Sequence, residues 1–324
     1  NMSQRYFNYS DRTYQVKSEY TRTVRPDYPA ADLIEVNVFS VTNLESKQEE
    51  KGAATMVYSV KYKDVSFRIW QTYANARKQD YILRVGFTNY GCHSDNNHAE
   101  DYSRAESVAE HTLGTMTLIE LMEMFYPDEG SPEIYARCKR LMRFHDLGET
   151  AAGDTPDNGT RDKAAINLVE YTCLNENISH LPDGVKEAIL NDFDIFNGSP
   201  QELTGEELKL HELCKLADKT DAILRGLVYE RHHHCGHYAN VPEGTGSKRE
   251  SEYAKIMNSD KLVDIFFAGF IKDYHQYSYF PILLDIIRAA IIDVRREWYD
   301  NWDEIVKKLG ISDQEYDLHT FQKK

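Results

Sequence analysis

The sequence predicts a mainly α-helical bundle with a small β-containing segment at its N-terminus. From Ser103 onward, apolar residues recur at helical spacing, whereas the first quarter of the chain carries shorter runs typical of strands. Hydrophobic residues make up 41% of the 324 residues, which is enough to bury a sizeable core. We therefore expect a helical core over residues 81–300, a β-containing extension over 1–80 and a C-terminal tail over 301–324.

The N-terminal extension combines an irregular part with expected strands. Residues 1 to about 30 are polar and rich in tyrosine without a clear period, which suggests an extended arm. Residues 32–42 alternate partly between apolar and polar side chains. Residues 55–62 and 65–73 are typical of two strands joined as a hairpin, and the charged stretch Glu45–Gly52 is expected to be a loop.

The first core helix has a marked start. Ser103 with Glu106, and Ser107 with Glu110, are overlapping capping-box candidates, because each serine is followed by a glutamate three residues later. The apolar stripe that follows includes His111. This histidine is therefore expected to face inward rather than toward solvent.

A second helix is predicted to begin at Ser131-Pro132, since serine caps helices well and proline fits the first turn. Its stripe reaches His145, and Glu149 would share that face because the two residues are four apart. Asp146 would point about a quarter-turn away. Further helices are expected over about 161–177, 205–231, 260–273 and 279–298.

The charge balance excludes several classes of partner. Lys and Arg number 38 against 53 Asp and Glu, a net charge of −15, which disfavours general binding to nucleic acid or to a membrane surface. Five scattered cysteines without a Cys-x-x-Cys pair predict no disulfide framework and suit a reducing, cytoplasmic setting. The N-terminus is polar, so no secretion signal is expected. The most apolar stretch, Phe280–Val294, is interrupted by charges and is expected to be a buried helix.

Two imidazoles and two carboxylates stand out as candidate metal ligands: His111, the adjacent pair His145 and Asp146, and Asp218. Imidazole nitrogen and carboxylate oxygen together suit divalent transition metals. Four such ligands on an octahedral ion leave positions for water and a phosphate oxygen, which indicates a metal-dependent phosphohydrolase. Asp221, one turn beyond Asp218, remains an alternative to it as the fourth ligand.

Each of these residues also has a structural interpretation. His111 alone could be a core histidine, and Glu149 and Asp154 could be solvated surface acids. A local cluster, His232-His233-His234-Cys235 with His237, is a second candidate metal site. It lacks a carboxylate at fixed spacing, so a loop near the mouth of the site is the favoured interpretation.

At these residues the chain resembles the HD-domain phosphohydrolases, which are named for the adjacent His-Asp pair. Their pattern of His, His-Asp and Asp is matched by the four candidate ligands. Three longer segments resemble the 5′-deoxynucleotidase branch of that family: Ser103–Thr112, His145–Asp154 and Leu213–Leu224. The resemblance covers about residues 80–230.

The resemblance implies one divalent transition metal (Mn, Co, Fe, Ni or Zn) and hydrolysis of the 5′-phosphomonoester of (deoxy)nucleoside monophosphates to nucleoside and phosphate. Glu149 and Asp154 match the family's acidic pair near the attacking water. Arg104 matches the arginine that approaches the phosphate or sugar. Arg84 matches a further arginine, although Phe87 stands here where the family has tryptophan.

Other functions stay open at this point. Glu149 stands where cyclic-nucleotide phosphodiesterases of the superfamily have histidine, and Thr150 where guanosine-tetraphosphate hydrolases have a second acid. A dNTP triphosphohydrolase remains an alternative, although a triphosphate would require more cations than this acidic region offers. A non-catalytic nucleotide-sensing or regulatory HD protein is a third possibility. The family resemblance further implies a homodimer, with a nucleotide as the small-molecule partner.

Overall fold

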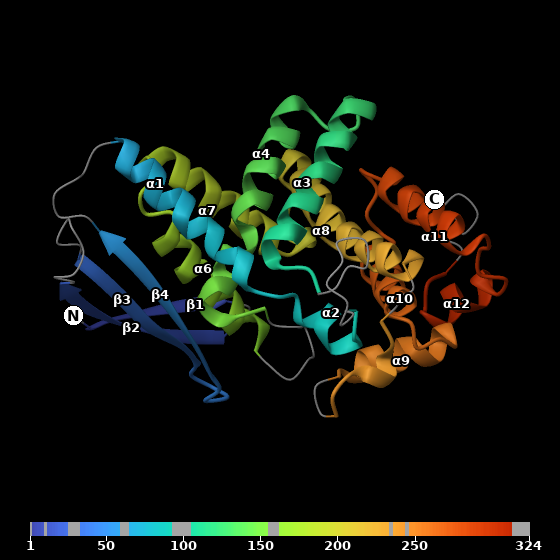
Figure 1. Ribbon diagram of the computed structural model, residues 1–324, viewed down its shortest axis with the longest axis horizontal. Helices are drawn as coiled ribbons and strands as arrows, with labels where there is room; N and C mark the ends of the chain where they lie inside the picture. Colours follow the sequence, from blue (N-terminus) through green and yellow to red (C-terminus); the bar gives the residue numbers. More distant parts are fainter. Residues whose placement is uncertain are drawn as a thin grey trace. The chain divides into compact units, whose positions relative to one another are not determined.

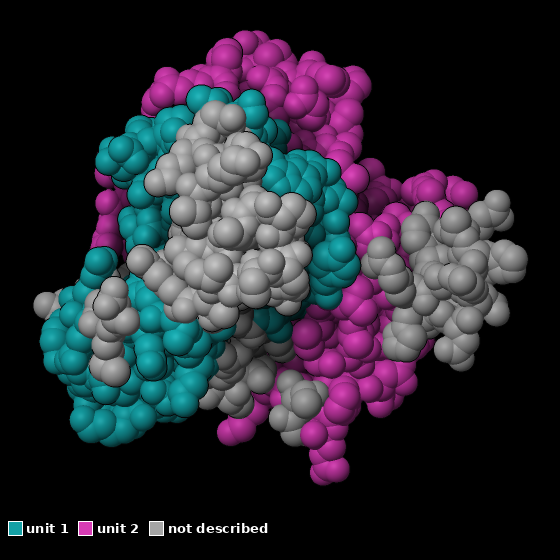
Figure 2. Space-filling view, turned by 60° about the vertical axis from the view of Figure 1, so that its left-hand side comes forward, with its two compact units in different colours: residues 1–82, 143–197 teal, residues 83–142, 198–324 magenta. Residues whose placement is uncertain are grey.

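The computed structural model divides into two compact units, which Figure 2 colours separately, and each unit combines two separate stretches of the chain. Unit 1 comprises residues 1–82 and 143–197, and unit 2 comprises residues 83–142 and 198–324. The structure describes residues 2–9, 12–24, 33–58, 65–92, 105–154, 162–232, 236–243 and 246–312. The predicted domain bounds, with a helical core over residues 81–300, stay a prediction. The two compact units do not test where that core begins and ends.

Unit 1 contains a four-stranded antiparallel sheet in the order β1-β2-β3-β4 (Figure 1). Its strands are β1 (Met2–Tyr9), β2 (Arg12–Val24), β3 (Leu33–Asn43) and β4 (Glu49–Tyr58). The expectation of an extended arm over residues 1–30 is therefore wrong for the first two strands. Their side chains are mostly polar because only one face of the sheet is covered, so apolar residues such as Tyr14 and Val16 occupy alternate positions.

The expected hairpin over residues 55–73 is also wrong. Strand β4 begins at Glu49, earlier than expected, because a short turn follows β3; the Asn43 carboxamide oxygen accepts hydrogen bonds from the backbone N–H groups of Glu45 and Ser46. Residues Val65–Ala76 form helix α1 instead of a strand. The β-branched and aromatic residues of this stretch favour a strand locally, but its apolar positions also repeat at helical spacing.

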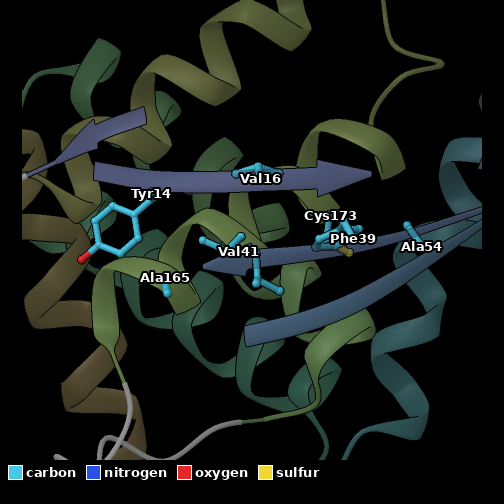
Figure 3. Close-up of a cluster of buried hydrophobic side chains, with 8 residues drawn as sticks. Tyr14, Val16, Phe39, Val41, Ala54, Ala165 and Cys173 are labelled. Carbon is cyan, nitrogen blue, oxygen red and sulfur yellow. The ribbon is translucent and has the colours of Figure 1, made fainter. Parts of the chain in front are cut away.

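The core of unit 1 lies between the sheet and helix α6 (Lys163–Asn177). Buried side chains of β2, β3 and β4 meet buried side chains of α6, as the close-up in Figure 3 shows: Tyr14, Val16, Phe39, Val41 and Ala54 with Ala165, Val169 and Cys173. The Asp162 carboxylate caps α6 by accepting from the N–H groups of Ala164 and Ala165. It also accepts hydrogen bonds from Asn43 (2.7 Å) and Tyr14 (3.1 Å), so one carboxylate ties the helix start to two strands.

The remaining described elements of unit 1 are two 3-10 turns, one short helix and one helix of 15 residues. They are the 3-10 turns η1 (Arg77–Tyr81) and η3 (His145–Gly148), and the helices α5 (Glu149–Ala152) and α7 (Asp183–Asn197). Turn η3 lies against α6 so closely that a Cβ added to Gly148 would be 2.6 Å from the Cα of Glu170. Glycine is required at this approach because any side chain would collide with the helix backbone.

Unit 2 is helical and is organised around the 27-residue helix α8 (Gly205–Arg231), whose predicted bounds are confirmed. The other main helices are α2 (Val85–Tyr90), α3 (Val108–Phe125), α4 (Pro132–Phe144), α9 (Lys248–Met257), α10 (Leu262–Tyr274), α11 (Ile282–Arg295) and α12 (Trp302–Lys308). Two 3-10 turns, η4 (Pro200–Glu202) and η5 (Tyr238–Asn240), flank α8 along the chain. Helix α8 contacts α3, α10 and α11 (Figure 1). The prediction of a mainly α fold with a small N-terminal sheet is thus confirmed.

A half-buried ion network joins three of these helices. The Arg295 guanidinium of α11 donates to both carboxylate oxygens of Glu230 on α8, at 2.7 and 2.9 Å, and to Asp264 on α10 at 2.6 Å. Such two-pronged pairs are the strong form of charge-assisted hydrogen bond.

None of the helices in the described part of the chain has the length and the apolar character needed to span a membrane.

Replacement of Arg295 by alanine should destabilise the protein by about 3 kcal/mol, because the largely buried carboxylate of Asp264 loses its cation and Glu230 keeps only Lys261, at 3.3 Å. Urea denaturation followed by circular dichroism measures this change. Arg231→Ala is the matched control: it removes the partner of Asp293 in an exposed pair and should cost no more than about 0.5 kcal/mol. Equal effects of the two substitutions would contradict a stabilising role for the network.

Candidate metal centre

Helix α3 holds His111 on its buried side. The predicted capping box is confirmed: the Glu110 N–H donates to the Ser107 hydroxyl, and the Ser107 N–H donates to the Glu110 carboxylate at 2.6 Å. This cap sets the start of the helix one turn before His111. The His111 side chain has no exposed surface, as its inward stripe predicted.

Helix α8 presents two carboxylates to this single imidazole. Asp218 Oδ1 lies 2.8 Å from His111 Nε2, and Asp221 Oδ2 lies 2.6 Å from His111 Nδ1. Residues three apart on a helix share one face, which explains how both reach the ring. The sequence offered the two aspartates as alternatives, whereas the structure has both in contact with His111, through different ring nitrogens.

Acidic groups dominate the surroundings of His111. Burial by itself would lower the pKa of His111, but the carboxylates of Asp218 and Asp221 outweigh burial and raise it. Burial raises the pKa of the neighbouring Glu106 to about 7. Glu106, His111 and Asp221 each offer a potential ligand atom, and these atoms lie within 4.8 Å of one another. Arg225 Nε lies 3.5 Å from the Glu106 carboxylate.

Two cations balance this acidity on the side of Asp218. Lys219 Nζ lies 3.0 Å from Asp218 Oδ2, and this carboxylate raises the pKa of Lys219. The positive charge of Arg84 opposes the increase in the pKa of His111 and of Lys219. The backbone N–H of Arg84 donates to the carbonyl oxygen of Glu106 at 2.8 Å, which anchors it beside the start of α3.

Lys219 is a candidate site residue that the sequence did not predict. The available signal was its position directly after Asp218. A side chain that follows a buried ligand by one helical position lies about 100° around the helix, at the border of the buried face. The exposed fraction of the Lys219 side chain, 47%, fits that border position.

Unit 1 carries the other predicted ligand pair. His145 Nε2 lies 3.1 Å from Asp146 Oδ1 within turn η3, and the buried His145 ring packs edge-on against Phe196. The expectation that His145 and Glu149 lie four apart on one continuous helix is wrong. Helix α4 ends at Phe144, and Glu149 begins α5 after a 3-10 turn, since Gly148 packs against the backbone of α6.

The remaining predicted site residues have varied outcomes. Asp154 follows Gly153, whose positive φ of 76° redirects the chain after α5. Arg104 lies outside the described residues, as do residues 233–235 of the histidine cluster. His237 of that cluster has a structural contact: its Nδ1 lies 3.1 Å from Asp260 Oδ1. The roles assigned to all these site residues stay predictions.

The donor chemistry of each unit fits a divalent metal. In unit 2 an imidazole nitrogen and a carboxylate oxygen meet at 2.8 Å, and in unit 1 an equivalent pair meets at 3.1 Å. Imidazole and carboxylate together suit Zn, Mn, Fe, Co and Ni, whereas a site built from oxygen alone would favour Mg or Ca. Each unit by itself therefore brings an imidazole together with at least one carboxylate suited to a divalent ion.

The chain matches the model of a known protein family. The family model described as an HD domain matches residues 96–257, which is half of the chain and includes His111, His145, Asp146 and Asp218. No curated protein matches the sequence. The protein therefore belongs to the HD-domain family, whose members are typically metal-dependent phosphohydrolases.

Proposed function

We propose that this protein hydrolyses the 5′-phosphomonoester of (deoxy)nucleoside monophosphates, releasing nucleoside and phosphate. The observation that carries the proposal is the buried His111–Asp218 pair with Lys219 beside it and the charge of Arg84 acting on His111, in a chain of the HD-domain family. Metal-ligand chemistry next to cations is the arrangement that phosphate-ester hydrolysis requires. A nucleotide as the partner, and a homodimer, stay predictions.

The proposed metal is one divalent transition ion, Mn, Co, Fe, Ni or Zn, held by His111, His145, Asp146 and Asp218. The HD-domain match spans all four of these residues, which supports their joint assignment. When bound, such an ion supplies positive charge that acidifies water and stabilises negative charge on a phosphoryl oxygen.

The protein's own cations would bind the phosphate. Lys219 carries a positive charge in contact with Asp218 and is exposed enough to leave this carboxylate for a phosphate oxygen. The positive charge of Arg84 acts on His111 and Lys219, which makes it the second candidate. Because the chain has a net charge of −15, a phosphate dianion depends on such local cations for its binding. Arg104 remains a proposed third contact to the phosphate or sugar.

Acidic residues would handle the proton of the attacking water. Glu149 begins α5 directly after the turn that carries His145 and Asp146, so it stays close to these ligands along the chain. A carboxylate so placed can orient water and accept its proton while the ester bond breaks. Asp154, half-exposed just beyond α5, is the proposed second acid.

The charge balance near Asp218 favours a monophosphate over a triphosphate. Among the described residues around His111, the acids Glu106, Asp218 and Asp221 stand against the cations Arg84, Lys219 and Arg225, so no excess of positive charge is present. A triphosphate brings more negative charge than a monoester and would therefore require additional cations. Triphosphate hydrolysis and nucleotide sensing without turnover are the competing outcomes of the experiment below.

Purified protein with Mn²⁺ or Co²⁺ should release orthophosphate from one or more nucleoside 5′-monophosphates, and Asp146→Ala should abolish that release. A panel of ribo- and deoxynucleoside mono- and triphosphates, read by phosphate colorimetry and chromatography, measures this. Asp293→Ala, at an exposed position on α11, is the control and should retain activity. Tripolyphosphate from triphosphates would replace the monophosphatase proposal, and nucleotide binding without turnover would favour a sensor.

Glu149→Gln should lower kcat by about 10²- to 10⁴-fold, because glutamine cannot accept the proton of the attacking water. The dissociation constant for Mn²⁺, measured by calorimetry, should stay unchanged in this variant. Full turnover by Glu149→Gln with metal bound would refute its role as the base.

Lys219→Ala should reduce kcat/KM by about 10- to 100-fold, since a lost charged hydrogen bond costs about 1.5–3 kcal/mol. Steady-state kinetics on the preferred monophosphate tests this. The matched control is Lys209→Ala, on the same helix, where the ammonium lies over the Tyr279 ring. If both lysine variants behave like the wild type, Lys219 does not bind substrate.

A further inference from the structure

His111 has a carboxylate at each of its two ring nitrogens, at 2.6 Å from Asp221 and 2.8 Å from Asp218. A neutral imidazole that binds a metal offers one nitrogen to the ion and carries its proton on the other. In metalloproteins that second N–H usually donates to a carboxylate, which fixes both the tautomer and the ring orientation. The two aspartates are therefore suited to different roles.

The surroundings distinguish the two nitrogens. On the Nε2 side, Asp218 shares its second oxygen with Lys219, whose partly exposed ammonium marks the direction of solvent and of an incoming anion. On the Nδ1 side, Asp221 lies near Glu106, and the Arg225 guanidinium already stands 3.5 Å from the Glu106 carboxylate. The proposed ligand set includes Asp218 and not Asp221, so the ion would lie on the Nε2 side and the Nδ1 side would be left to Asp221.

A glycine makes the position of Asp221 possible. A Cβ added to Gly114, one turn after His111 on α3, would lie 2.1 Å from Asp221 Oδ1. The Asp221 carboxylate is therefore in contact with the backbone of α3, between Gly114 and the His111 ring. Glycine within a helix costs about 1 kcal/mol relative to alanine, so its presence inside α3 is explained by the space that Asp221 requires.

We propose that Asp221 is a positioning residue for the metal centre. Its carboxylate accepts the Nδ1–H of His111 and holds the ring in the tautomer whose Nε2 lone pair points toward Asp218. Gly114 provides the room for this contact. This inference rests on the metal site of the proposed function but not on the identity of the substrate.

Binding of Mn²⁺ to the metal-free protein, measured by calorimetry, tests the proposal. Asp221→Ala should weaken Mn²⁺ binding by about 10- to 100-fold, the usual effect of losing the carboxylate behind a ligand histidine. Gly114→Ala should weaken it in the same direction by displacing Asp221. Asp221→Asn should lie in between, because an amide oxygen can still accept the Nδ1–H. Asp218→Ala should show the largest loss, and Asp293→Ala should show none.

A second readout follows the proton itself. In Zn²⁺-loaded protein with ¹⁵N-labelled histidine, the His111 resonances should report a proton on Nδ1 in the wild type. Loss of that signature in Asp221→Ala and Gly114→Ala, with circular dichroism unchanged, is the result expected of a positioning residue. If Asp221→Ala fails to fold, Asp221→Asn and Gly114→Ala carry the test.

The inference would be overturned if the wild type did not bind Mn²⁺, or if Asp221→Ala bound it with wild-type affinity. It would also be overturned if Asp221→Ala and Glu106→Gln lost Mn²⁺ binding while Asp218→Ala kept it. That last result would place the ion on the Nδ1 side. These measurements use the metal alone, without a nucleotide. If the variants changed Mn²⁺ affinity as expected but the protein hydrolysed no nucleotide, only the proposed function would be refuted.

Discussion

The approach of helices α3 and α8 is the constraint on which the chemistry of unit 2 depends. This approach places the fully buried His111 between Asp218 and Asp221. The two helices are so close at Gly114 that a larger residue there would displace Asp221. A buried imidazole flanked by two carboxylates would be a costly group in an ordinary core, because each charge must be compensated. Its cost is understandable if the site exists to bind a cation.

A comparable constraint shapes unit 1. The sheet packs on α6, and Asp162 fixes the start of that helix to β2 and β3. Helix α6 also contacts turn η3, where Gly148 approaches Glu170, and this turn carries His145 and Asp146. The N-terminal sheet therefore contributes indirectly to the position of His145 and Asp146, because α6 packs against the sheet and also contacts the turn that carries them.

Electrostatics connects these features to function. The chain is strongly acidic, and the surroundings of His111 are acidic as well, which attracts a metal ion but repels a phosphate. Lys219 lies next to Asp218, and the charge of Arg84 acts on Lys219 and His111, so both cations counter that repulsion. The pairing of Lys219 with Asp218 also keeps the ammonium in place before any anion arrives.

The sequence by itself determined the helical class, the capping box at Ser107, the bounds of α8 and the His-Asp pattern of the family, because caps and helical periodicity act between residues close along the chain. Only the tertiary structure decided that residues 12–24 form a strand and residues 65–76 a helix, since their ambiguous patterns depend on which face is covered. It likewise decided that α4 ends before His145, where Gly148 meets α6. Asp218 and Asp221 share one face of the predicted helix, so the sequence does not distinguish their roles. Their roles differ only in the folded protein, where each contacts a different ring nitrogen of His111.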